Sequence, residues 1–62
     1  MVYVTKIEDG VTKLYNSYGH YQRIIGDRGA VNAQVQGDVV VVYYADGRVC
    51  LYNLLGHYMR RV

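Results

Sequence analysis

The stretch DGRVCLYNLLGHYMRRV, residues 46–62, decides the fold because the chain carries it twice. Residues 9–25 read DGVTKLYNSYGHYQRII, and an ungapped alignment at an offset of 37 gives nine identities in seventeen positions. Upstream, Val2 and Val4 align with Val39 and Val41. We therefore interpret the chain as a single domain, 1–62, that contains an internal repeat, 2–25 and 39–62.

Turn signals divide each copy into three strands. Asp9-Gly10 in the first copy and Asp46-Gly47 in the second are typical of hairpins, because Gly accepts the positive φ of a type I′ turn. Asn16-Ser17-Tyr18-Gly19 predicts a longer connection that ends in a left-handed residue, and residues 53–56 repeat this pattern.

One further strand is expected at about 30–36, where polar residues alternate with Val31, Ala33 and Val35. The predicted fold class is therefore all-β, an antiparallel meander of about seven strands, and a small sandwich or barrel is the alternative. The predicted strands are residues 2–7, 11–15, 20–25, 30–36, 39–44, 48–52 and 57–62.

The strand from Val39 to Tyr44 is apolar at every position. Such a strand favours aggregation if it lies at a sheet edge, so we expect it inside a sheet with both faces covered. A chain of 62 residues has little material for both layers.

Length and composition point towards association between subunits. A domain of 62 residues buries only about 60% of the surface that its unfolded chain exposes. Disulfides or metals often add the missing stability, but Cys50 is the single cysteine, and His20 and His57 are the only histidines. We therefore expect a homo-oligomer. The formal net charge of +2 is too small to mark a dedicated nucleic-acid binder.

The sequence gives few signs of a cellular location. Residues 1–6 lack the pattern of a secretory signal, and the apolar run 39–45 is too short to span a bilayer. One unpaired thiol fits a reducing compartment. We therefore expect a cytoplasmic protein without membrane contact.

The repeated unit resembles a β-propeller blade, similar in style to the WD-repeat and NHL-like propellers. The residues that carry the likeness are Asp9-Gly10 through Gly19 and Asp46-Gly47 through Gly56, although the Trp-Asp dipeptide of the WD-repeat is absent. The resemblance implies one complete blade over 30–62 and a first blade without its innermost strand. Fewer than two blades cannot close a ring of four to eight, so it also implies a homo-oligomer, for example three chains of two blades each.

The residues with chemical potential have simpler structural explanations. His20 and His57 occupy the same place in both copies, and duplication explains them better than metal binding or catalysis does. Asp9 and Asp46 precede the turn glycines, and Cys50 has no evident base or cysteine partner. We therefore predict no enzyme activity, no metal site and no cofactor.

Tyrosine and arginine provide the candidate binding residues. Tyr21 and Arg23 are two residues apart, as are Tyr58 and Arg60 in the second copy, so each pair is expected on one face of its strand. Such faces suit a protein interface, in which Tyr and Arg are enriched. They also suit base stacking with phosphate contacts.

Two functions therefore remain open from the sequence. The first is a non-enzymatic assembly or protein-interaction module whose partner and process are unknown. The alternative is a nucleic-acid-binding module that uses the Tyr/Arg faces.

Overall fold

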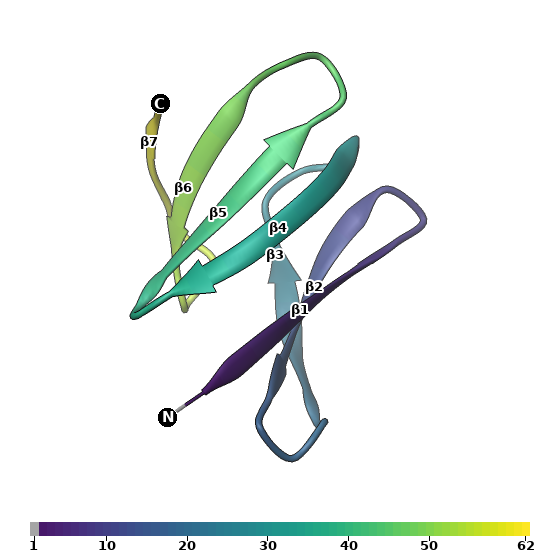
Figure 1. Cartoon of the computed structure of the whole chain (residues 1–62), viewed down its shortest axis with the longest axis vertical. Helices are drawn as coiled ribbons and strands as arrows, with labels where there is room; N and C mark the ends of the chain where they lie inside the picture. Colours follow the sequence, from purple (N-terminus) through teal and green to yellow (C-terminus); the bar gives the residue numbers. More distant parts are fainter. Residues whose placement is uncertain (1) are drawn as a thin grey trace.

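The computed structural model describes residues 2–62, and these residues form seven strands in two antiparallel sheets (Figure 1). The three-stranded N-terminal sheet has the order β1-β2-β3 and the four-stranded C-terminal sheet the order β4-β5-β6-β7. The predicted all-β meander is confirmed. The strands are β1 (Tyr3–Glu8), β2 (Val11–Asn16), β3 (Tyr21–Ile25), β4 (Ala30–Gln36), β5 (Val39–Tyr44), β6 (Val49–Asn53) and β7 (Tyr58–Arg61).

The turns form as their residues predict. Asp9 and Gly10 both have positive φ, 54° and 77°, as a type I′ hairpin requires. After β2, the side-chain Oδ1 of Asn16 accepts hydrogen bonds from the backbone N–H groups of Tyr18 and His20. Asn53 accepts the corresponding bonds after β6. The asparagines therefore fix both connections.

The hairpin between β5 and β6 is one residue longer than the hairpin between β1 and β2. Tyr43 pairs with Val49, and the N–H of Gly47 donates to the carbonyl oxygen of Tyr44 at 3.0 Å. Because of the extra residue, Val39 lies opposite Asn53 just as Tyr3 lies opposite Asn16. In the strand before the turn, equivalent residues of the two copies are thus 36 positions apart, whereas after the turn they are 37 apart. The predicted alignment of Val2 and Val4 with Val39 and Val41 is wrong by one residue.

The core lies between the two sheets. Cross-strand partners point to the same side of a sheet. Pairs such as Thr5–Leu14 and Val42–Cys50 therefore define the inner faces. The buried core residues are Leu14, Ile25, Ala30, Val40, Val42, Tyr44, Cys50 and Tyr52.

Backbone contacts between the sheets hold them in one arrangement. The N–H groups of Gly29 and Ala30, at the start of the C-terminal sheet, both donate to the carbonyl oxygen of Gly10 in the N-terminal sheet. The hydroxyl of Thr5 donates to the carbonyl oxygen of Ala33 at 3.2 Å. Among residues 2–62 no strand pairing joins the sheets, so they pack face to face without closing a barrel.

The apolar strand β5 lies inside the C-terminal sheet, between β4 and β6. Its inner side is covered by the N-terminal sheet, with Val40 and Val42 fully buried. Its outer side carries Val41, which is 8% exposed, and Val39 and Tyr43, which are half-buried. The predicted internal position is confirmed, but the cover on the outer side is incomplete.

Residues 2–62 contain no helix that is long and apolar enough to cross a membrane.

Candidate functional site

The predicted Tyr/Arg faces do not form, because a β-bulge separates each pair. Tyr21 lies opposite Tyr15 and Arg23 lies opposite Leu14, so Gln22 is an extra residue in β3. Neighbours along β2 point to opposite faces of the sheet. The tyrosine and the arginine therefore also point to opposite faces.

The second copy has the same bulge, in which Met59 is the extra residue between Tyr58 and Arg60. The rings of Tyr15 and Tyr21 pack edge to face, with centroids 5.8 Å apart, and those of Tyr52 and Tyr58 pack in the same way. This packing places Tyr21 on the outer face of its sheet and Tyr58 on the inner face.

The two arginines have different surroundings. Arg23 is half-buried on the inner face, and its Nε is buried without a hydrogen-bond partner. Arg60 lies opposite Leu51 on the outer face of the C-terminal sheet and is exposed. In neither sheet, therefore, do the tyrosine and the arginine of a predicted pair lie on the same surface.

The two copies use different faces when they pack against each other. The N-terminal sheet contributes the face that contains Leu14, whereas the C-terminal sheet contributes the face that contains Tyr52. Leu14 corresponds to Leu51 and Tyr52 to Tyr15, and both of those equivalents lie on outer faces. The contact between copies is thus head to tail, and each copy keeps one unused packing face.

Burial shows that these outer faces are open versions of the internal contact. Ile25 is fully buried, whereas its equivalent Val62 is 75% exposed. Val40 is fully buried, whereas its structural equivalent Val4 is 51% exposed. A groove of about 280 Å³ lies beside Val4 and Tyr15 on the outer face of the N-terminal sheet. Its position corresponds to the region of the C-terminal sheet, around Val40 and Tyr52, that packs against the N-terminal sheet inside the chain.

Charges distinguish the outer face of the N-terminal sheet from its buried counterpart. Lys6 and Lys13 occupy the positions of Val42 and Cys50. Lys13 pairs with Glu8 at 3.4 Å, and the hydrogen bond from Lys13 lowers the pKa of the Glu8 carboxyl. The ammonium of Lys6 lies 5.9 Å from the centre of the Tyr15 ring.

A second hollow, a cleft of about 460 Å³, lies where the end of β3 meets the inner face of β6 and β7. We call it the inter-sheet cleft. Its polar and aromatic lining includes Asp27, Arg48, Cys50, Tyr52, Tyr58 and Arg61.

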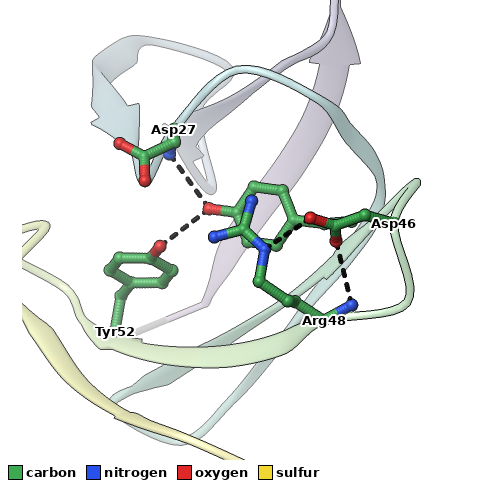
Figure 2. A network of polar contacts seen from close by, with 5 residues as sticks. Asp27, Asp46, Arg48 and Tyr52 are labelled. Atoms are coloured by element: carbon green, nitrogen blue, oxygen red, sulfur yellow. Dashed lines mark hydrogen bonds and ion pairs between the residues drawn. The ribbon is translucent and has the colours of Figure 1, made fainter.

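Hydrogen bonds between tyrosines fix the wall of the inter-sheet cleft (Figure 2). The hydroxyls of Tyr44 and Tyr52 lie 2.7 Å apart, and the backbone N–H of Asp27 donates to the Tyr44 hydroxyl at 2.9 Å. Burial, together with the hydrogen bond to Tyr44, raises the pKa of the Tyr52 phenol. Gly26 allows this approach, because an added Cβ there would lie 2.9 Å from the Tyr52 ring.

Arg48 is held over the same wall. Its Nε donates to Asp46 Oδ2 at 2.8 Å, and its guanidinium lies 4.6 Å from the centre of the Tyr44 ring. The backbone N–H of Arg48 and then its side chain lower the pKa of the Asp46 carboxyl.

The remaining candidate residues have structural roles. His20 and His57 are exposed, and their carbonyl oxygens accept bonds from Asn16 and Asn53. Asp9 forms its turn, and Asp46 bonds with Arg48. Cys50 is a buried free thiol in the cleft wall.

The sequence interpretation missed Asp27, Arg48 and Arg61 as site residues. A signal for the arginines was present, because Arg48 and Arg61 replace Val11 and Ile24 of the other copy. A charged residue in one copy, at a position where the other copy has an apolar residue, indicates that the charge has a role at that place. The role of Asp27 had no such signal, since it lies in the connection between the copies.

Comparison of the chain with known protein families, with curated proteins and with solved structures finds no match.

Proposed function

We propose that this protein is a self-assembling interaction module in which copies associate head to tail through their outer faces. The outer face of the C-terminal sheet of one copy packs on the outer face of the N-terminal sheet of the next. One observation carries the proposal: within the chain the corresponding faces already pack together, and they bury Leu14, Ile25 and Val40 to 1% exposure or less.

The equivalent residues suit the same contact. Leu51 and Val62 would take the places of Leu14 and Ile25, and the groove beside Val4 and Tyr15 would receive them. Arg60 would take the place of Arg23, whose Cδ lies 3.8 Å from the Cβ position of Gly56. Gly19, the equivalent of Gly56, has open space at its Cβ position.

The lysines set the strength of the proposed contact. Both lysines would face the outer side of the C-terminal sheet, which carries Arg60. Glu8 offsets the charge of Lys13, so Lys6 supplies the net positive charge of this face, and like charges repel across an interface. The aliphatic stems of the lysines can still cover apolar surface while the ammonium groups stay in water. We therefore expect a weak association that strengthens as salt screens the repulsion.

The nucleic-acid alternative depends on tyrosine and arginine acting from one face, and the bulges at Gln22 and Met59 separate them. Salt distinguishes the two proposals, because phosphate-driven binding weakens steeply as salt rises. The propeller-like arrangement that the repeat suggests is one way in which head-to-tail packing could close into a ring.

The test is light scattering coupled to size exclusion over a range of protein and salt concentrations. The proposal predicts a mass that rises above that of the monomer with protein concentration, and rises further with salt. Val62→Lys should reduce the association at least about tenfold, or roughly 1.4 kcal/mol. Leu55→Lys is the matched control, because Leu55 is 63% exposed in a turn outside both faces. A monomer at all concentrations, or equal effects of the two variants, would contradict the proposal.

A further inference from the structure

The inter-sheet cleft presents positive charge on one wall. Arg61 lies opposite Cys50, and Arg48 precedes Cys50 by two residues, so both arginines belong to the inner face of the C-terminal sheet. Arg61 forms no ion pair with any residue in 2–62. Arg48 uses its Nε for Asp46, which leaves its two terminal nitrogens without a partner among the described residues.

The opposite wall presents negative charge. Asp27 lines the inter-sheet cleft at the end of β3, and the bond from its backbone N–H to Tyr44 fixes its position. Within the described residues its carboxylate forms no ion pair or hydrogen bond. Asp27 and Arg61 therefore line one cleft without neutralising each other by direct contact.

An aromatic ring completes the site. Tyr58 is 59% exposed and lines the inter-sheet cleft, and its ring is held against Tyr52 by their edge-to-face contact. The cleft volume of about 460 Å³ falls in the range of small-molecule sites. The charges on the two walls are thus complementary to a ligand with two ends of opposite charge.

We propose that the inter-sheet cleft binds a small zwitterion, with a carboxylate or phosphate at one end and an ammonium group at the other. The planar donors of Arg48 and Arg61 suit the oxygens of the anionic end. The carboxylate of Asp27 holds the ammonium end. The site lies on an inner face, so it is independent of the outer faces that serve the proposed assembly.

The test uses the ¹⁵N-labelled 62-residue chain titrated with four probes: phosphoethanolamine, β-alanine, inorganic phosphate and ethylammonium. The amide signals of Gly26 and Gly56, both in the cleft lining, report binding. Phosphoethanolamine or β-alanine should bind at least about fivefold more tightly than inorganic phosphate or ethylammonium, each of which carries charge of one sign only, because two charged contacts act together. The stronger of the two identifies the anionic group as phosphate or carboxylate.

Neighbouring arginines provide the matched control. Arg61→Gln should weaken binding of the better zwitterion at least about fivefold, whereas Arg60→Gln, on the outer face, should leave it within about twofold. Asp27→Asn should weaken the zwitterion and spare inorganic phosphate. The proposal is overturned if no probe shifts the glycine signals at tens of millimolar, if phosphate alone binds as tightly as the zwitterions, or if the two arginine variants behave alike.

Discussion

Two threonines on the inner face of the N-terminal sheet, Thr5 half-buried and Thr12 buried, show how one hydroxyl can stabilise the fold and another destabilise it. Thr5 donates to the carbonyl oxygen of Ala33, whereas Thr12 is fully buried and its hydroxyl has no partner. A buried polar group without a hydrogen bond costs about 1–3 kcal/mol. The second copy has Val49 at the position of Thr12.

Thr12→Val should therefore raise the free energy of unfolding by about 1 kcal/mol, since it keeps the shape and removes the unpaired hydroxyl. Thr5→Val should lower it by about 1 kcal/mol, because it removes a formed hydrogen bond. Urea denaturation of both variants measures the two changes. A loss of stability in Thr12→Val would show that the hydroxyl has a partner, such as an ordered water.

Gly26 and Gly47 separate the effect of backbone conformation from that of close contact. Both have positive φ, 78° and 95°, but only at Gly26 would a Cβ meet the Tyr44 hydroxyl and the Tyr52 ring. We expect Gly47→Ala to cost about 1 kcal/mol from the left-handed backbone. Gly26→Ala should cost about 3 kcal/mol, because overpacking is added. Equal costs in thermal or urea unfolding would refute the close contact.

Because the pKa of Tyr52 is raised, the free energy of unfolding should fall at alkaline pH. A phenol with a higher pKa in the folded state contributes stability that is complete below its ordinary pKa, 10.0, and declines as the pH rises above that value. At pH 7, Tyr52→Phe should cost about 1 kcal/mol through the lost bond to Tyr44.

Above pH 10 the stability difference between the wild type and Tyr52→Phe should shrink, because only the wild type loses the contribution of this phenol. Urea unfolding at several pH values provides the measurement. Tyr18→Phe is the control, because Tyr18 is 82% exposed, and its unfolding free energy should run parallel to that of the wild type. A constant difference between the wild type and Tyr52→Phe would contradict the buried phenol.

At the scale of the elements, the strands were predictable and their relative register was not. Alternation and turn residues predict the ends of all seven strands to within one residue, and β4 and β5 at their observed bounds. The extra residue at Ala45 and the bulges at Gln22 and Met59 depend on hydrogen bonding between strands. A shift of one residue moves a side chain to the other face, so the predicted Tyr/Arg faces failed.

The site shows the same limit. Repetition of Tyr and Arg drew attention to conserved positions of the two copies, whereas the inter-sheet cleft uses Arg48 and Arg61, at which the copies differ. Their proximity to Asp27 arises from packing between sheets, which a strand pattern does not specify. Sequence reasoning therefore located the strands and missed the cleft between the sheets.

At the scale of the whole molecule, the repeat relates unlike faces. The inner face of one sheet corresponds to the outer face of the other, so further copies that repeated the packing inside the chain would add head to tail. A head-to-tail interface joins two different faces, one from each copy, whereas a two-fold interface uses the same face of both copies. Variants that damage one face at a time therefore distinguish these forms of association.

The most direct measurement is the mass of Val4→Lys, of Val62→Lys and of their equimolar mixture, by light scattering at a concentration at which the wild type associates. Val4 and Val62 are exposed on different outer faces, so either change should leave the fold intact. Head-to-tail packing predicts that each variant alone is monomeric and that the mixture forms a heterodimer through the two undamaged faces. Full self-association of either variant alone, or a mixture that stays monomeric, would contradict the account.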